Sequence, residues 1–189
     1  MRCFVAVDLS PAVRAAMAAA QRDLREAAGH ADVRWVEPAA FHLTLKFLGE
    51  VAAERRAALE QALAGATAGH GALGLVAHGL GGFPSARRPR VVWAGVGGQV
   101  EEVRALAAAV EEALGGLGFS PEARGFNAHV TLGRVRSPRG LGELARALAT
   151  SEARGFGTWT VNEIVLYRSH LGPRGAVHEP LVRVTLTSP

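Results

Sequence analysis

The sequence contains little cysteine, few charges and no long apolar run. Its only cysteine among 189 residues is Cys3, which excludes an intramolecular disulfide framework and a metal site built from cysteines alone. No stretch of about eighteen apolar residues is free of charge, and this excludes a transmembrane helix. The apolar run near the N-terminus ends at Asp8, too early for the core of a signal peptide. We therefore expect a cytoplasmic protein with no membrane contact.

The apolar content that is present is enough to build a folded core. Hydrophobic residues make up 49% of the chain and charged residues 20%, a balance typical of globular proteins rather than disordered ones. No stretch rich in proline, serine or glycine is long enough to link independent domains. We therefore expect a single domain over residues 1–189, built as two lobes.

Positive charge is carried almost entirely by arginine. The chain has 21 Lys and Arg residues against 17 Asp and Glu, and Lys46 is its only lysine. Arginine suits phosphate binding, because a guanidinium can pair with two phosphate oxygens at once. The same excess follows from GC-rich codons, which also favour Ala and Gly, so composition leaves both interpretations open. The net charge of +4 does not by itself indicate a nucleic-acid-binding protein.

Apolar periodicity and helix signals predict alternating strands and helices. Ser10 and Pro11 mark a helix start, as N-cap and first helical residue, and Gly29 marks its end. Glycines within residues 73–83 indicate a bulge or bend. Strands are expected over residues 4–9, 33–36, 41–48, 73–83, 91–96, 130–135, 156–168 and 181–186, and helices over 11–28, 52–68, 99–114 and 141–149. This order predicts an α+β fold with helices on the outer faces of one or two antiparallel sheets.

Two of the seven histidines share a local pattern. His42 and His129 are each followed by an apolar residue, a threonine and a second apolar residue, and the threonines are Thr44 and Thr131. None of the other five histidines has Ser or Thr two residues later. Two full matches, one in each half of the chain, exceed what chance placement predicts.

Strand geometry gives this pattern a meaning. Residues i and i+2 of a strand point to one face, so His42 shares a face with Thr44, and His129 shares one with Thr131. Two such strands facing each other form a cleft with two imidazoles and two hydroxyls. The alternative interpretation is that each pair is the polar outer face of a half-exposed strand.

Two imidazoles across a cleft suit phosphodiester chemistry. A neutral imidazole can take a proton from an attacking water while an imidazolium gives one to the leaving oxygen. Threonine hydroxyls can donate to the non-bridging oxygens. The chain has only three Asp, and no His-x-His or Glu-x-x-His pattern lies near either strand, so we expect no metal and no cofactor. No Ser, and not Cys3, lies in a recognisable nucleophile setting.

These residues resemble the two-histidine (2H) phosphoesterase superfamily, named for its paired His-x-Thr/Ser-x motifs. The closer resemblance is to its bacterial and archaeal RNA 2′,3′-cyclic phosphodiesterases, historically called 2′-5′ RNA ligases. The similarity covers nearly the whole chain and is carried by residues 2–9, 33–36, 42–49, 82–85, 92–95, 129–135 and 165–169. It implies a bilobal, pseudo-twofold fold in which two concave antiparallel sheets face each other across a central cleft, with helices outside.

The resemblance also implies an activity, the hydrolysis of RNA 2′,3′-cyclic phosphate ends to 2′-phosphates. By motif position, His42 corresponds to the proton donor to the leaving 3′-oxygen and His129 to the base that activates water. Thr44 and Thr131 correspond to phosphate-binding residues, and so does Arg134. Simple alternation puts Arg134 on the face opposite His129, so either Gly133 marks a bulge or the long side chain wraps round the strand.

Other residues have two interpretations each. Alternation puts Lys46 on the His42 face, where it adds positive charge to the cleft or is a solvated strand-end lysine, and it puts Phe47 in the core. The aromatic residues Trp35, Trp93 and Tyr167 either stack on a base or pack in the core. The loop arginines Arg87, Arg88 and Arg90 either follow an RNA backbone or are solvated.

Three functions follow from these motifs. The first is metal-independent hydrolysis of RNA 2′,3′-cyclic phosphate ends, with a small cyclic nucleotide also open as substrate. The second is the reverse reaction, 2′-5′ joining of RNA halves such as tRNA fragments, which the same acid and base perform by microscopic reversibility. The third is a non-catalytic RNA-end-binding module. In each case we expect a monomer with RNA as its partner.

Overall fold

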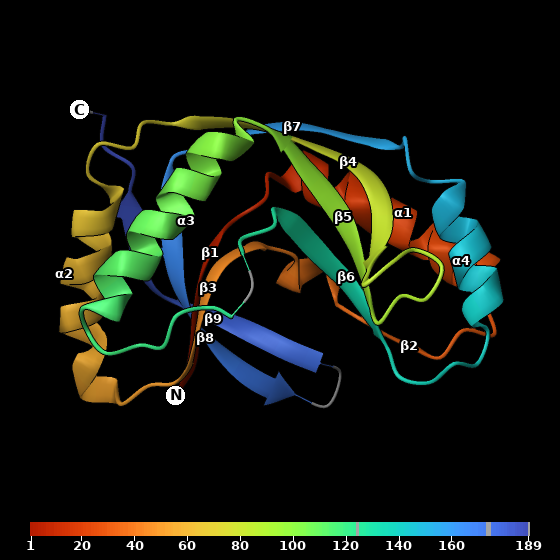
Figure 1. Cartoon of the computed structure of the whole chain (residues 1–189), viewed down its shortest axis with the longest axis horizontal. Coiled ribbons are helices and arrows are strands. Elements are labelled where there is room, and N and C mark those ends of the chain that lie inside the picture. The colour runs from red at the N-terminus through yellow and green to blue at the C-terminus, as the bar shows by residue number, and fades with distance from the viewer. Residues whose placement is uncertain (124, 173–174, 189) are drawn as a thin grey trace.

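The computed structural model describes residues 1–123, 125–172 and 175–188. It confirms an α+β fold of antiparallel strands and helices (Figure 1). The strands are β1 (Arg2–Val7), β2 (Val33–Trp35), β3 (Leu43–Glu50), β4 (Leu73–Phe83), β5 (Val91–Gly98), β6 (His129–Val135), β7 (Gly155–Val161), β8 (Glu163–Gly172) and β9 (Gly175–Thr185). The helices are α1 (Pro11–Ala27), α2 (Arg56–Thr67), α3 (Val100–Gly115) and α4 (Leu141–Ala149), with short 3₁₀ helices at Pro38–Ala40 and Ala53–Arg55.

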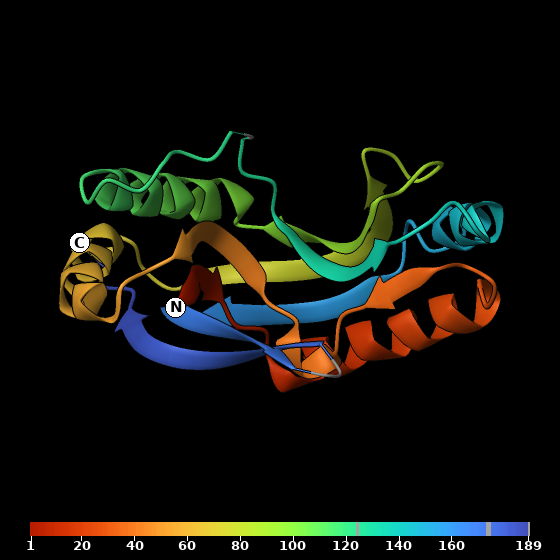
Figure 2. The ribbon, with the colours of Figure 1, turned by 90° about the horizontal axis from the view of Figure 1, so that it is seen from below.

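The strands form one sheet, not two. Their order is β7-β4-β5-β6-β3-β1-β8-β9, and β2 is paired to β6 outside this path. At the centre, β3 and β6 are paired only at Leu43 and Val130. The expectation of two separate sheets is therefore wrong in this respect, because a narrow junction makes the sheet continuous. Helices α2 and α3 lie together at one end of the molecule and α1 and α4 at the other (Figures 1 and 2).

Helix α1 confirms the start that the sequence predicted. The Ser10 hydroxyl accepts a hydrogen bond from the Val13 amide at 3.3 Å, and Pro11 occupies the first turn. The apolar face buries Met17 and Leu24 against the sheet. The helix therefore begins where a side-chain cap satisfies a free amide, and packing of its apolar face supplies most of its stability.

The C-terminal strands differ from the prediction. The expected single strand over residues 156–168 is two strands, β7 and β8, separated at Asn162. β7 is paired to β4 and β8 to β1, so one apolar run crosses the molecule and changes its partner halfway. The last strand begins at Gly175 rather than Leu181 and forms a long hairpin with β8. The change of partner at Asn162 separates the two strands.

Strand β3 carries a bulge inside the first histidine motif. Thr44 is paired with Ala6, and Lys46 is paired with Val5, so Leu45 is the extra residue. One extra residue reverses the faces of the residues that follow it. Lys46 therefore turns toward helix α3, and the next side chain turns toward the His42 face.

Strand β6 carries a bulge at the same place in the second motif. Thr131 is paired with Trp93, and Gly133 is paired with Val92, so Leu132 is the extra residue. The buried Gln21 side chain of α1 donates to the Leu132 carbonyl at 2.8 Å. The same carbonyl also accepts from the Val36 amide at 2.9 Å, so two donors hold the bulged residue in place. Both motifs thus have an extra residue three positions after the histidine.

Candidate active site

The backbone just before β3 fixes the position of His42. Its Nδ1 lies 2.8 Å from the Ala40 carbonyl oxygen. A carbonyl only accepts, so Nδ1 carries the hydrogen and Nε2 has the free lone pair. The turn itself is held by Arg14 of α1, whose Nη1 donates at 2.8 Å to the carbonyls of both Pro38 and Phe41. The His42 ring is stacked on Phe4, with centroids 4.6 Å apart.

His129 is held in the same way. Its Nδ1 lies 2.7 Å from the Asn127 carbonyl oxygen, so again Nε2 carries the free lone pair. The edge of its ring meets Phe83, with centroids 5.0 Å apart. Each histidine thus donates to the carbonyl two residues before it and keeps the same nitrogen free. This is the tautomer that an acid or base pointing away from its own backbone requires.

The antiparallel pairing of Leu43 with Val130 places the two histidine motifs side by side in opposite directions. Each of these residues follows a motif histidine. Because the strands run in opposite directions, the histidine of each motif falls opposite the threonine of the other. The narrow junction between the strands therefore gathers all four side chains at one place in the sheet.

A cavity of about 300 Å³ lies at this junction. Its lining includes four of the predicted site residues: His42, Thr44, Thr131 and Arg134. His129 lies two residues along β6 from Thr131 but is not part of the lining. The rest of the wall includes Arg2, Cys3, Phe4, Phe47, Ser169, Leu171 and His178. Two guanidinium groups, from Arg2 and Arg134, give the cavity positive charge.

Arg134 reaches this cavity because of the bulge in β6. Simple alternation puts it on the face opposite His129, but the extra residue Leu132 returns it to the face of Thr131. Of the two alternatives that the sequence left open, the bulge is the one present, and it falls one residue before Gly133. Glycine is required at position 133 for a different reason, the close approach of strand β2. A Cβ there would come within 2.7 Å of Val33 and 2.9 Å of Trp35.

The expectations for Lys46 and Phe47 were wrong. The Lys46 side chain is fully buried, and its Nζ donates to Glu111 of α3 at 2.6 Å and to the Ser120 carbonyl at 2.9 Å. Phe47 is not in the core but is 56% exposed and lines the cavity. The physical reason is the bulge at Leu45, which exchanges the faces that alternation assigned to these two residues.

A third histidine, His178 of β9, lies against His42. The edge of one ring meets the other with centroids 5.1 Å apart, and His178 also meets Phe4 at 4.8 Å. Its Nδ1 is buried and has no hydrogen-bond partner among the described residues. The sequence holds no signal for this residue, because only the long β8–β9 hairpin brings it beside Phe4 of β1.

Burial shifts the pKa of all three imidazoles in the same direction. Desolvation lowers the pKa of His42 to about 4, against a smaller upward effect of the Ala40 carbonyl. Desolvation also lowers the pKa values of His129 and His178. The hydrogen bond to the Asn127 carbonyl opposes the shift at His129, and the Arg134 guanidinium adds to it. In the free protein, His42 is therefore neutral at neutral pH.

This burial predicts an acid-sensitive fold. The folded pKa of His42, about 4, lies below the unfolded value near 6.5, so protons bind the unfolded chain more readily. The stability is complete above pH 6.5, and about 3 kcal/mol of it is lost as the pH falls to about 4. Urea unfolding across this range measures the loss. His42→Gln should flatten the pH dependence, whereas His30→Gln, whose side chain is 84% exposed, should keep it.

The three aromatic residues with a stacking role among their interpretations have different environments in the structure. Tyr167 is buried, and its hydroxyl donates to Asp8 Oδ1 at 2.6 Å. Trp35 packs over Gly133, within 2.9 Å of where a Cβ would stand. These two side chains serve the protein's own packing. Trp93 instead lines a second, larger cavity beside His129.

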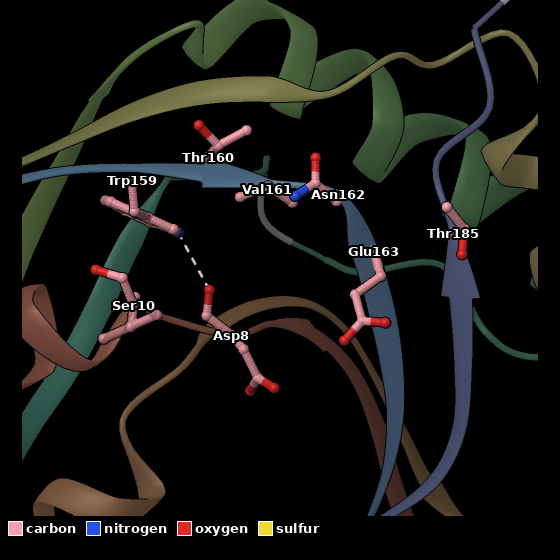
Figure 3. A pocket seen from close by; sticks show the side chains of 9 residues that line it. Asp8, Ser10, Trp159, Thr160, Val161, Asn162, Glu163 and Thr185 are labelled. Atoms are coloured by element: carbon pink, nitrogen blue, oxygen red, sulfur yellow. Dashed lines mark hydrogen bonds between the residues drawn. The ribbon is translucent and has the colours of Figure 1, made fainter.

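A cavity of about 510 Å³ on the far side of Asp8 holds none of the predicted site residues (Figure 3). Trp159 Nε1 donates to the Asp8 backbone carbonyl at 3.1 Å, and the Asp8 carboxylate points away from the indole. That carboxylate lines a small cavity with His42 and Tyr167. Asp8 is thus held at both ends, and it supports the wall behind His42.

Comparison with known protein families identifies the family of this chain. A family model described as LigT like Phosphoesterase matches residues 7–93 and 96–178, most of the chain. The chain therefore belongs to the LigT-like phosphoesterases of the 2H superfamily, which confirms the family that the paired motifs suggested. None of its described helices is long and apolar enough to cross a membrane.

Named relatives and solved structures agree with this placement. An RNA 2′,3′-cyclic phosphodiesterase of Archaeoglobus fulgidus is 38% identical over 96% of this chain and 98% of its own. An RNA 2′,3′-cyclic phosphodiesterase of Aeropyrum pernix is 38% identical over 87% of this chain and 94% of its own. The crystal structure of TT0787 of Thermus thermophilus superimposes with a TM-score of 0.77 at 30% identity, covering 100% of this chain and 99% of that one. E. coli LigT complexed with 3′-AMP gives a TM-score of 0.72 at 29% identity, covering 99% and 98%.

Proposed function

We propose that this protein hydrolyses RNA 2′,3′-cyclic phosphate ends to 2′-phosphates, without a metal, by two-histidine acid–base catalysis. The observation that carries the proposal is the crossed junction of β3 and β6, where each motif histidine falls opposite the threonine of the other. Relatives named RNA 2′,3′-cyclic phosphodiesterase support the substrate class. In the described part of the chain, no three His, Cys, Asp or Glu side chains form a cluster suited to a metal ion.

The phosphate occupies the cavity between the motifs in this proposal. Thr44 and Thr131 donate their hydroxyls to the non-bridging oxygens, and Arg134 supplies charge. His129 Nε2 takes a proton from water, whose oxygen forms a bond to phosphorus. The bond from phosphorus to the 3′-oxygen breaks, and His42 Nε2 gives that oxygen its proton. The product is a 2′-phosphate with a free 3′-hydroxyl.

The order of the sheet supports a two-lobed arrangement around this cavity. The path β7-β4-β5-β6-β3-β1-β8-β9 places the motif strands at its centre, each next to a strand that precedes a long helix, β5 before α3 and β1 before α1. Both central strands carry a bulge after the threonine. We infer that residues 1–189 form one domain with a pseudo-twofold site. We also infer that the protein is a monomer and that its physiological substrates include the ends of tRNA fragments.

The test of the function is the product formed from an oligonucleotide with a 2′,3′-cyclic phosphate end in excess EDTA. We expect a 2′-phosphate as the sole new end. A 3′-phosphate would contradict the assignment of the leaving oxygen, and binding without turnover would favour the RNA-end-binding module. Loss of activity in EDTA that returns with a divalent cation would overturn metal independence.

The pH profile tests the acid–base assignment separately. His42 must be protonated to act as the acid, yet burial lowers its pKa to about 4 in the free protein. A bound phosphate anion raises that pKa, since opposite charge favours the imidazolium. We therefore expect bell-shaped profiles whose alkaline limb lies at higher pH for kcat than for kcat/KM. A single-limbed profile, or coincident alkaline limbs, would contradict this mechanism.

A further inference from the structure

The cavity at the junction of β3 and β6 has polar side chains that the proposed reaction does not use. The residues that hold the cyclic phosphate in that reaction lie on β3 and β6. Another part of the lining includes Arg2 of β1, Ser169 of β8 and His178 of β9. None of these three side chains takes part in the proposed steps of hydrolysis.

Strand pairing places the three residues side by side. Ser169 is paired with His178. Cys3 of β1 is paired with Arg168 of β8, so the following position in the same register sets Arg2 beside Ser169. Residues directly opposite each other on antiparallel strands share one face of the sheet. Arg2, Ser169 and His178 therefore form a row across three strands, on the face that lines the cavity.

The Arg2 guanidinium is available to a ligand. Arg2 is exposed, and Glu50, its partner across the strands, lies 3.2 Å from the N-terminal ammonium instead. No described carboxylate forms an ion pair with Arg2. A guanidinium with unused donors at the wall of a cavity suits a phosphate, which can accept two hydrogen bonds from it.

His178 adds an N–H to this row. Desolvation lowers the pKa of His178, so the ring is neutral at neutral pH and carries one hydrogen. Its Nδ1 is buried and has no hydrogen-bond partner among the described residues. A buried donor without an acceptor is costly, so the hydrogen is more favourable on Nε2. A ligand in the cavity can accept it there.

The row lies on the side of the leaving oxygen. The His178 ring meets that of His42, with centroids 5.1 Å apart, and His42 gives its proton to the 3′-oxygen in the proposed function. The ribose that carries this oxygen is therefore on the same side, and in an RNA strand its 5′-oxygen carries the next phosphate. A cyclic mononucleotide has no phosphodiester at that position.

We propose that Arg2 and His178, with the Ser169 hydroxyl between them, bind the phosphodiester on the 5′ side of the terminal nucleotide. The inference rests on the proposed function, and it makes a strand of two or more nucleotides a better substrate than a cyclic mononucleotide. Arg2 supplies charge, and the other two side chains each donate a hydrogen bond to a phosphate oxygen. Leu171, two residues after Ser169 in β8, is 77% exposed and lines the same cavity, an apolar surface suited to the nucleoside beyond that phosphate.

The test compares two dinucleotides that both end in a 2′,3′-cyclic phosphate and differ only in their internal linkage, a charged phosphodiester or a neutral methylphosphonate. The measured quantity is the ratio of their kcat/KM values, in which effects on the chemistry at the cyclic end cancel. The wild type should prefer the phosphodiester about 10- to 100-fold. Arg2→Ala should lower this preference about 10-fold. His178→Phe, which keeps an aromatic ring against His42, should lower it about 2- to 10-fold.

Arg168→Ala is the matched control for Arg2→Ala. Arg168 precedes Ser169 in β8 but is outside the lining, so its loss removes one positive charge nearby without removing a contact. It should change the preference far less than Arg2→Ala does. Equal kcat/KM values of the wild type for the two substrates would overturn the subsite. An unchanged preference in Arg2→Ala or in His178→Phe, or an equal fall in Arg2→Ala and Arg168→Ala, would also overturn it.

A binding measurement separates this inference from the proposed function. By calorimetry, a dinucleotide that ends in a 2′-phosphate should bind about 10-fold or more tightly with a phosphodiester linkage than with a methylphosphonate, and Arg2→Ala should reduce the difference. That result without any hydrolysis of cyclic ends would overturn the proposed function and retain the phosphate subsite. Hydrolysis of cyclic ends with equal binding of the two dinucleotides would overturn the subsite alone.

Discussion

His42→Ala and His129→Ala should each lower the rate of hydrolysis of a cyclic phosphate end by about 10²- to 10⁴-fold, the usual contribution of a positioned acid or base. Each imidazole has its Nδ1 engaged by a backbone carbonyl and its Nε2 free, so alanine removes the only proton-transferring atom of that motif. The measurement is single-turnover cleavage of a labelled oligonucleotide. His30→Ala, far more exposed and outside the site, serves as the control with wild-type activity.

A substrate with a better leaving group distinguishes the acid from the base. If the 3′-oxygen is replaced by sulfur, the leaving group departs without a proton, and the acid becomes dispensable. His42→Ala should then recover most of its lost rate, whereas His129→Ala should not. Recovery in His129→Ala instead would exchange the two roles. Near wild-type activity of either variant on the natural substrate would refute two-histidine catalysis altogether.

Lys46→Ala should destabilise the fold by about 3 kcal/mol, the lower end for breaking a buried ion pair, because Glu111 keeps some contact with solvent. The substitution removes the Lys46 ammonium from the Ser120 carbonyl and from the Glu111 carboxylate, which keeps a hydrogen bond from the Glu122 amide at 3.2 Å. Urea unfolding measures the loss. The same variant should still hydrolyse cyclic phosphates below its unfolding temperature, because Lys46 does not line the cavity.

Arg104→Ala provides the matched control for this prediction. Arg104 is paired with Glu101 on the same helix at 3.6 Å, but both side chains are exposed, and such pairs contribute at most about 1 kcal/mol. A loss in Lys46→Ala no larger than in Arg104→Ala would contradict the buried pair. A selective loss of activity in a stably folded Lys46→Ala protein would return Lys46 to the substrate site.

The sequence predicted the elements better than their connections. The start of α1 was predictable because Ser10 and Pro11 act within one turn. The single long strand over residues 156–168 was wrong, since the change of partner at Asn162 depends on β4 and β1, which lie far away in the chain. The early start of β9 was missed for the same reason. Pairing between distant strands leaves little trace in local periodicity.

The site shows the same division at the level of single residues. Alternation grouped His42 with Thr44 correctly, since both line the same cavity. It failed at Lys46 and Phe47, one and two residues after the bulge at Leu45. His178 lies at the site only through the pairing of β9 with β8 and of β8 with β1, so no spacing in the sequence connects it to His42.

By itself, the sequence determined the chemistry that this chain carries: two imidazoles, each with a threonine two residues later, on strands of an α+β fold without disulfides. Those properties depend on residue type and on the two-residue repeat of a strand, which are local. The tertiary structure alone decided which side chains surround the cavity at the junction of β3 and β6, because the bulges at Leu45 and Leu132 arise from cross-strand pairing. The extra residue in β3 turned the only lysine away from this cavity, and the extra residue in β6 brought Arg134 to it.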